Sequence, residues 1–281
     1  MKLYLFKQRS SVSGALQQQR GASLVELVAV IVLLGVIGTG LINFIAGGAE
    51  AYREVVRRDE VAQIGRFAIE RVARELRSAL PGSVRTSGNC IEFVPVGAAS
   101  LYTELPVAGL ASAANTFSVV SSGSVAGMTR AAVYTLNAAD VYAGGNLLLG
   151  FNASSASTTA GETTYTFSSP LQQFAEQSPG RRIFFVDEPV SFCVTGTVTN
   201  RVLNRYSDYG YSAVQAVPPS GGHLLAQFIQ LVDGGVVQPF QFNAGTLQSN
   251  GTVHLDFRFL ARGTTSEWVR FSHDVVLQNV P

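Results

Sequence analysis

The stretch "QQQRGASLVELVAVIVLLGVIGTG", residues 17–40, changes from polar and basic to apolar within a few positions and holds one carboxylate, Glu26, where the apolar part begins. From Leu27 to Ala49 the chain carries no charge, and these 23 residues are enough to cross the hydrocarbon core of a bilayer as a helix. The fold and the function to be expected depend on why an acid stands at the start of such a segment.

The charge of the chain is distributed unevenly around this segment. Residues 1–21 contain four basic side chains and no acidic one, whereas the rest of the 281-residue chain has a net charge of −3 and no lysine. A basic segment before a membrane span stays in the cytoplasm, so the remainder is predicted to face the other side. Cys90 and Cys193 both lie in that exported part, where an oxidising compartment favours one disulfide between them.

Three interpretations of the apolar segment compete. A secretory signal would be cut near "AGGAEA", residues 46–51, but the apolar region is too long and Glu26 interrupts it. A plain uncleaved anchor would tolerate Glu26 at the cytoplasmic interface. The third interpretation takes the basic leader, Gly21, the small residue after it, Glu26 and the uncharged run as one signal.

"RGASLVELVAVIVLLG" resembles the type IV prepilin signal of the pilin and pseudopilin superfamily. The resemblance implies that a prepilin peptidase cuts after Gly21 and methylates the new amine of Ala22, although most members have phenylalanine at that position. Glu26 then matches the conserved glutamate of the family. In a filament its carboxylate is expected to meet the terminal ammonium of a neighbouring subunit, because an unpaired charge in an apolar sheath is costly.

Residues 50–80 are charged and periodic, and Pro81-Gly82 ends the pattern. The periodicity predicts one helix from Ala22 to about Leu80, with its first half in lipid or the filament core and its second half packed on a globular head. Acidic side chains lie among the arginines of the second half, which argues against nucleic-acid binding. The expected head-facing stripe consists of Val61, Ile64, Ala68, Val72 and Leu76.

Glycines are frequent in the apolar half, and each lowers helix propensity by about 1 kcal/mol relative to alanine. Two interpretations stay open, close helix–helix approach in a bundle or local loosening when the subunit leaves the bilayer. The residues concerned are Gly35, Gly38, Gly40, Gly47 and Gly48.

From Ser83 onward the composition is typical of β-structure. The clearest predicted strands lie in 90–96, 182–194 and 236–242, and 252–276 is predicted to form an antiparallel hairpin around "ARGTT". The nearly uncharged segment 108–170 is predicted to form short strands with variable loops at the outer surface of the head.

Motifs of catalysis are absent from the sequence: there is no G-x-S-x-G, P-loop, H-E-x-x-H or cysteine pair at zinc spacing. The chain is therefore expected to be no enzyme and to need no cofactor or metal. Several polar groups could hold a metal ion such as calcium, but an ordinary solvated surface explains them equally well. They are His254, Asp256, His273, Asp274, Asp187, Glu188 and the loop 206–211.

The head blocks "NCIEFVPV" and "RRIFFVDEPVSFCV", followed by "LNRYSDYGY", are similar to the biogenesis protein O family of the mannose-sensitive haemagglutinin (MSHA) pilus. The resemblance implies an α+β, type IV pilin-like fold, with a long N-terminal helix packed on an antiparallel β-rich head. The implied parts are a leader (1–21), a transmembrane or filament-core helix (22–49), an amphipathic stalk helix (50–80) and a periplasmic head (81–281).

The function implied by this resemblance is that of a minor pilin-like subunit in the bacterial inner membrane, acting in pilus assembly or initiation. The implied partners are other pilins through the N-terminal helix, the prepilin peptidase, the inner-membrane assembly platform and membrane lipid, with no nucleic acid. Two alternatives are a J-type pseudopilin of a type II secretion system and a signal-anchored periplasmic binding domain.

Overall fold

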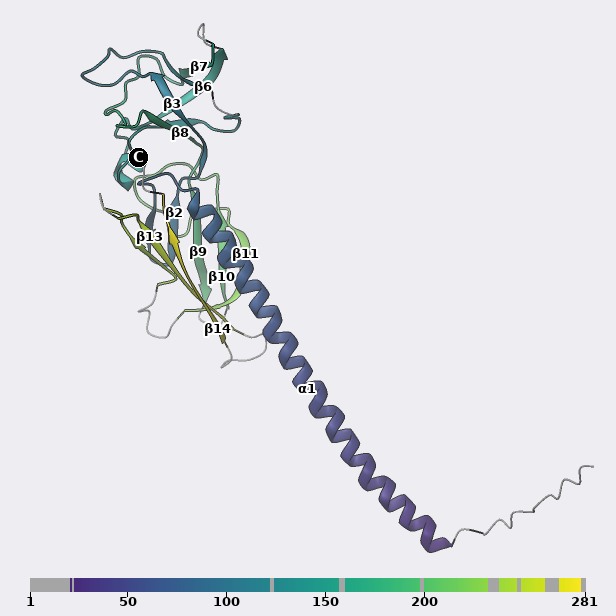
Figure 1. Ribbon diagram of the computed structural model, residues 1–281. Helices are drawn as coiled ribbons and strands as arrows, with labels where there is room; N and C mark the ends of the chain where they lie inside the picture. The colour runs from purple at the N-terminus through teal and green to yellow at the C-terminus, as the bar shows by residue number, and fades with distance from the viewer. Residues whose placement is uncertain are drawn as a thin grey trace, which may run out of the picture. The chain divides into compact units, whose positions relative to one another are not determined.

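A computed structural model describes residue 21 and residues 23–121, 124–156, 160–197, 200–231, 238–246, 249–260 and 268–278 (Figure 1). Side chains are described throughout these ranges except at 153–156. The chain forms two compact units, Met1–Glu54 and Val55–Pro281. Helix α1, Leu24–Arg77, contributes residues to both units.

Helix α1 confirms the single helix predicted for residues 22–80, although it is shorter at its C-terminal end. The amides of Ser78 and Ala79 donate to carbonyls three residues back, at 3.1 and 3.0 Å, so the last turn tightens. The amide of Leu80 then donates to the carbonyl of Val94 at 2.8 Å. The helix therefore ends before the proline, because its last turn tightens and the next amide bonds to a residue that follows β2.

The Pro81-Gly82 turn leads from the helix into the sheet. Gly82 has a φ of +77°, and a Cβ atom there would lie 2.7 Å from backbone atoms of Leu136 and Asn137. Glycine is required for both reasons, since a side chain would be strained and would also collide. This close approach brings the turn against the loop that precedes the short helix α2, Ala138–Tyr142.

An eight-stranded antiparallel sheet forms the part of the second unit that packs on α1. Its order is β1-β2-β9-β10-β11-β13-β12, and β14 also pairs with β13. The strands are β1 (Arg85–Ser87), β2 (Cys90–Phe93), β9 (Val190–Thr197), β10 (Asn200–Tyr206), β11 (His223–Gln230), β12 (Phe240–Asn243), β13 (Thr252–Leu260) and β14 (Trp268–Val276). The predicted hairpin over 252–276 is confirmed by β13 and β14, and its turn lies outside the described residues.

The apolar stripe predicted on the second half of α1 is confirmed. Val61, Ala68, Val72 and Leu76 are buried against the sheet, and Ile64 is partly buried. Large aromatic side chains of the sheet complete this core, and burying apolar area of this kind is the main favourable term in folding. They are Phe93, Phe192, Phe240, Phe257 and Phe259.

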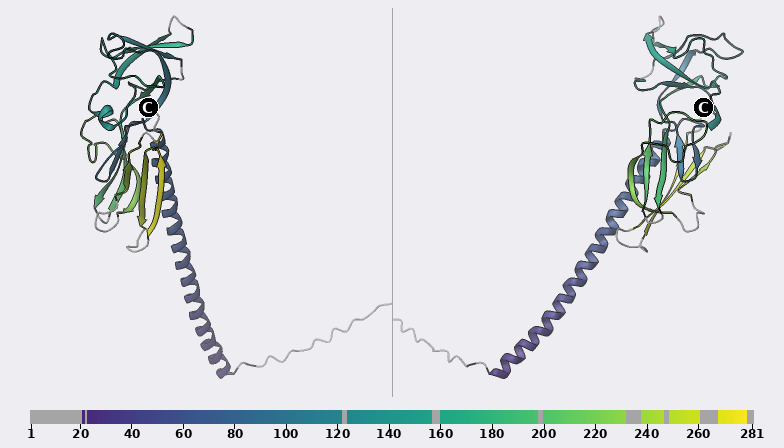
Figure 2. Two further views of the ribbon diagram at one scale, coloured as in Figure 1. Left: turned by 60° about the vertical axis from the view of Figure 1, so that its left-hand side comes forward. Right: turned by 180° about the vertical axis from the view of Figure 1, so that it is seen from behind.

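Helix α1 approaches the sheet closely at Gly65, where an added Cβ atom would lie 2.2 Å from the ring of Phe271 on β14. The views in Figure 2 show β14 alongside this half of the helix. Glu75 binds two arginines: Arg71 Nε lies 2.6 Å from its Oε1 and Arg205 Nε of β10 lies 3.0 Å from its Oε2. The first of these contacts is an i,i+4 ion pair within the helix.

A closed six-stranded antiparallel barrel is built from the chain between β2 and β9. In barrel order its strands are β3 (Val96–Glu104), β4 (Thr116–Val120), β7 (Glu162–Phe167), β6 (Leu148–Ala156), β5 (Arg130–Ala132) and β8 (Arg182–Val186). The interior is filled mainly by aromatic side chains: Tyr102, Phe117, Phe151, Tyr165, Phe167, Phe174 and Phe185.

The prediction of short strands for residues 108–170 is confirmed for β4, β5 and β7, which have 5, 3 and 6 residues, whereas β6 has 9. The sequence did not predict that these four strands belong to one closed barrel. A closed barrel has no free strand edge, so no charged side chains are needed to prevent pairing with another chain. A segment with few charges can therefore form these strands.

The predicted disulfide between Cys90 and Cys193 is present. The two residues are direct partners in the β2–β9 pair, with Cα atoms 4.1 Å apart, and both are buried. Tyr206 packs against the bridge as a buried neighbour, and Tyr209 as a partly buried one. The bond therefore joins the two strands between which the chain leaves the sheet to form the barrel.

Candidate functional site

The N-terminal candidate site is described at Gly21, Ser23 and Glu26, whereas Ala22 lies outside the described residues. The carbonyl of Ser23 accepts hydrogen bonds from the amides of Glu26 and Leu27, at 2.9 and 3.1 Å, and so begins α1. Glu26 consequently stands in the first helical turn, where the positive end of the helix dipole favours a carboxylate.

The helix surface around Glu26 is apolar and uncovered. Leu24 and Val25 are 80% and 75% exposed, and the following apolar side chains are exposed as well. By length and composition α1 is able to cross a membrane. An exposed apolar surface of this extent needs lipid or other apolar helices to cover it. When lipid or apolar helices surround it, the Glu26 carboxylate needs a cationic partner or must be protonated.

The glycines of the apolar half pack against no other part of the chain that the structure describes. All five are helical, and a Cβ atom added at any of them would meet nothing within 4 Å. Neither a turn nor a close intramolecular contact therefore accounts for Gly35, Gly38, Gly40, Gly47 and Gly48. Both interpretations of these residues stay open, namely contact with helices of other molecules and local loosening of α1.

A buried ion pair within the sheet also binds the loop after β10 through further hydrogen bonds of its two residues. Glu92 of β2 is 1% exposed and pairs with Arg85 of β1. The Tyr209 hydroxyl donates to the second Glu92 oxygen at 2.9 Å. The guanidinium of Arg85 also donates to the carbonyls of Ser212 and Ala213, at 2.8 and 2.9 Å. These bonds hold the loop after β10 against β1 and β2.

Three tyrosines in this region resist ionisation. Burial raises the pKa of Tyr142, Tyr209 and Tyr211 above the ordinary value of 10.0, and the Glu92 carboxylate raises the pKa of the first two further. These phenols stay neutral in the folded chain at a pH where the unfolded chain ionises. They therefore contribute stability below about pH 10 that is lost as the pH rises above it.

The expected result is an alkaline loss of stability. For the full chain in detergent, the free energy of unfolding should fall above about pH 10, by up to about 1.4 kcal/mol per pH unit for each such tyrosine. Urea unfolding at several pH values measures this, with phenolate absorbance followed in parallel. Ionisation of all tyrosines near pH 10 in a chain that remains folded would contradict the burial argument.

The histidines and acids of the β13–β14 hairpin form separate pairs. His254 Nδ1 lies 2.6 Å from Asp274 Oδ1, and Arg270 binds Asp256 through two hydrogen bonds of 2.9 and 2.7 Å. His273 Nε2 lies 3.3 Å from an arginine of α1. Within the part of the chain that the structure describes, no three His, Cys, Asp or Glu residues are grouped so as to hold a metal ion.

The two loops considered for calcium lie side by side. The Gly210 amide donates to Glu188 Oε2 at 3.1 Å, and the Tyr211 hydroxyl donates to the carbonyl of Asp187. The Thr129 hydroxyl donates to the Asp187 carboxylate at 3.1 Å. Both acids therefore accept hydrogen bonds from the protein, and the arrangement ties the loop after β10 to the barrel.

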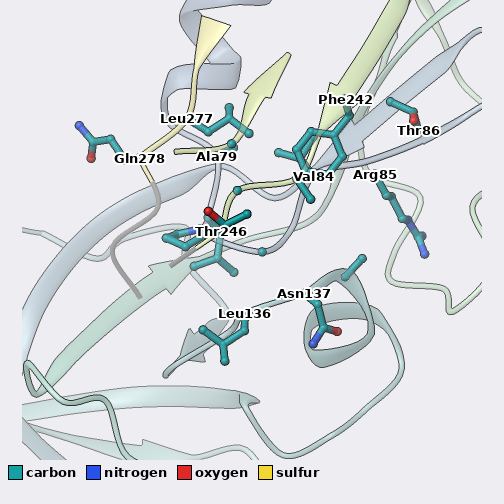
Figure 3. Close-up of a pocket in the computed structure, with 17 residues that line it drawn as sticks. Ala79, Val84, Arg85, Thr86, Leu136, Asn137, Phe242, Thr246, Leu277 and Gln278 are labelled. Carbon is teal, nitrogen blue, oxygen red and sulfur yellow. The ribbon is translucent and has the colours of Figure 1, made fainter. Parts of the chain in front are cut away.

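A cavity of about 710 Å³ lies where the end of α1, strand β1, strand β12 and the loop before α2 meet (Figure 3). Val84 and Phe242 lie together on one side of it and Leu136 on the other, while the Arg85 guanidinium points away. Sequence reasoning missed this cavity because its lining comes from four distant segments, none with a recognisable motif. They are 79–86, 136–138, 242–246 together with 251, and 277–278.

Comparison of the chain with protein-family models, with curated proteins and with solved structures finds no match. The function of the protein is therefore inferred from its own residues and their arrangement.

Proposed function

We propose that this protein is a minor pilin-like structural subunit of a type IV pilus of the MSHA type, similar to MshO, that a prepilin peptidase processes after Gly21. Its work is assembly or initiation of the pilus rather than catalysis. The observation that carries the proposal is Glu26, a carboxylate in the first turn of an exposed apolar helix and five positions after a glycine.

The chemistry of Glu26 explains why processing and assembly would be linked. Cleavage after Gly21 would give Ala22 a free or methylated ammonium group. Between packed apolar helices, that ammonium on one subunit and the Glu26 carboxylate on its neighbour compensate each other. A helix displaced along its axis would leave both charges unpaired, so the pair selects one register of assembly.

The rest of the chain suits such a subunit. The membrane-length part of α1 continues into a charged part that packs on a β-rich head. The disulfide between Cys90 and Cys193 favours an oxidising compartment for that head. We place the protein in the bacterial inner membrane with a periplasmic head, in contact with lipid, other pilins and the assembly platform.

The first test is the N-terminus of the full chain, expressed with and without a prepilin peptidase. Intact mass and terminal sequencing should show a chain that begins at Ala22 only when the peptidase is present. A Gly21→Val variant should stay uncut, because the resemblance places the scissile bond after this glycine. A matched Gly14→Val variant, changed within the leader, should be processed like the original chain.

A chain that keeps Met1 in the presence of the peptidase, or that begins near Glu50, would overturn the proposal and favour an anchored or secreted β-rich domain. A J-type pseudopilin of type II secretion would pass the processing test. Deletion of the gene separates the two machines, since loss of surface pili supports the proposal and loss of protein secretion supports the pseudopilin.

A further inference from the structure

The outer face of the β13–β14 hairpin brings a serine, a histidine and an aspartate together. His254 of β13 and Asp274 of β14 are direct cross-strand partners, and Ser272 is the next residue of β14 on the same face. His254 Nδ1 lies 2.6 Å from Asp274 Oδ1, and Ser272 Oγ lies 3.5 Å from His254 Nε2. One imidazole therefore stands between a hydroxyl group and a carboxylate.

These contacts define which nitrogen of the imidazole carries the proton. A carboxylate only accepts hydrogen bonds, so Nδ1 of His254 donates to Asp274. In the neutral imidazole Nε2 then has a lone pair, to which the Ser272 hydroxyl donates. A serine nucleophile is activated in this way, by a base that takes its proton and a third group that orients the base. The contact of the serine with the base is commonly long until a substrate binds.

The pairing of the two strands explains why these side chains meet. The Leu277 amide donates to the carbonyl of Gly251 at 2.9 Å, and hydrogen-bonded pairs alternate along an antiparallel ladder. His254 and Asp274 therefore form a pair without backbone hydrogen bonds, the kind in which side chains lie closer together. By the same alternation the Ser272 amide points away from β13, toward an edge at which the described residues provide no further strand.

Two donors beside Ser272 could stabilise the negative charge that forms on a carbonyl oxygen under attack. One is the Ser272 amide at the open edge of β14. The other is Arg270, two residues earlier on the same face, whose Nε and Nη2 donate to Asp256 at 2.9 and 2.7 Å. The Asp256 side chain is only 2% exposed, so a buried partner holds the guanidinium and leaves Nη1 for another acceptor. Donors that are held in place before the reaction stabilise a tetrahedral intermediate.

The three groups can be reached from solvent. The side chains of His254 and Asp274 are 30% and 71% exposed, and Ser272 is exposed as well. The opposite face of β14 packs on α1, where Phe271 lies against Gly65. An ester can therefore approach Ser272 from outside without a change in the fold.

We propose that Ser272 is a nucleophile that hydrolyses carboxylic esters, with His254 as its base and Asp274 as the residue that positions the base. The Ser272 oxygen forms a bond to the carbonyl carbon while its proton passes to His254 Nε2. The proton then passes to the alcohol oxygen as the bond between that oxygen and the carbonyl carbon breaks. Water attacks the acyl group on Ser272 with the same proton transfers, which releases the carboxylic acid and restores the serine.

This activity is separate from assembly, since it belongs to the head and does not involve Glu26 or processing of the leader. Sequence motifs did not indicate it, because the three residues come from two strands and meet only when β13 and β14 pair.

A fluorophosphonate probe tests the nucleophile in the full chain in detergent. The Ser272 oxygen should bond to phosphorus with loss of fluoride, and peptide mass spectrometry should find the label on Ser272. His254→Gln should slow labelling by about 100-fold or more, the lower end of a general-base contribution. Asp274 acts through the histidine, so Asp274→Asn should also slow labelling, whereas Asp274→Glu should retain most of the rate.

Two matched controls change groups of the same kind elsewhere in the head. Ser207→Ala removes a hydroxyl that donates to Asp208 rather than to a histidine, and His223→Gln changes an exposed histidine of β11. Both variants should be labelled at the original rate.

A second measurement follows the hydrolysis itself. Release of p-nitrophenol from p-nitrophenyl acetate should fall in Ser272→Ala and stay unchanged in Ser207→Ala, with circular dichroism checking that both variants are folded. Labelling that appears only on other serines, or that His254→Gln and His223→Gln affect equally, would overturn the proposal. Equal ester hydrolysis by the two serine variants would do the same, even if prepilin processing were established.

Discussion

A Glu26→Leu variant is expected to enter the membrane and to be processed after Gly21, yet to be nearly absent from assembled pili. The leucine leaves the ammonium of a neighbouring subunit without its counter-charge in an apolar surrounding. Breaking a buried pair in this way costs about 3 kcal/mol or more, so the pilus-bound fraction should fall roughly 100-fold. Immunoblots of sheared pili and of the membrane fraction measure this ratio.

The neighbouring residue supplies the control for this experiment. Val25→Leu changes an exposed side chain of the same first turn without altering charge, and it should assemble normally. Glu26→Gln keeps the size and a hydrogen-bonding group but removes the charge, and it should assemble poorly. If the leucine variant were found in pili at the original level, the pairing of Glu26 with an ammonium would be wrong.

The second large effect is expected inside the head, at the buried pair of Arg85 and Glu92. Arg85→Met removes the counter-charge of a carboxylate whose side chain is 2% exposed. It also releases the carbonyls of Ser212 and Ala213. The free energy of unfolding should fall by about 3–5 kcal/mol, the usual cost of leaving a buried charge unpaired. Urea unfolding followed by the fluorescence of Trp268, the single tryptophan, measures the change.

The double variant Arg85→Met/Glu92→Leu identifies the cause. It removes both charges, so it should be clearly more stable than Arg85→Met alone, and the double-mutant cycle should give a coupling energy. Arg130→Met is the matched control, because the Arg130 guanidinium stacks on the Tyr211 ring but forms no ion pair among the described residues. Its loss should cost only about 1 kcal/mol. Equal losses for the two arginines would refute the assignment.

Local patterns predicted the parts of the fold that local chemistry decides. The stripe from Val61 to Leu76 repeats at helical spacing, and the alternation in 252–260 has the period of a half-buried strand, so α1 and the β13–β14 hairpin were foreseeable. The disulfide followed from cysteine count and compartment. The end of α1 was placed too late because the amide of Leu80 bonds to the carbonyl of Val94, a partner that only the folded chain supplies.

The barrel and the cavity depend on contacts between distant residues. Closure of the barrel pairs Val96 with Val186, and no local pattern in the sequence between these two residues indicates that pairing. The cavity combines four segments that meet only after folding. The N-terminal motif is the reverse case: Gly21 and Glu26 stand out in the sequence, but the partner that would explain Glu26 belongs to another molecule.

The position of the barrel in the chain has a consequence for how this protein can vary. The chain leaves the sheet after Phe93 and returns at Val190, and these two residues are cross-strand partners. A tight hairpin turn would join the same two residues. The strand order of the sheet and its packing on the helix therefore do not require the barrel. The barrel is thus an insertion between two paired strands of that sheet. Its length and sequence can change without altering the pairing of β2 with β9 as long as those strands keep their register, which the disulfide between Cys90 and Cys193 also holds.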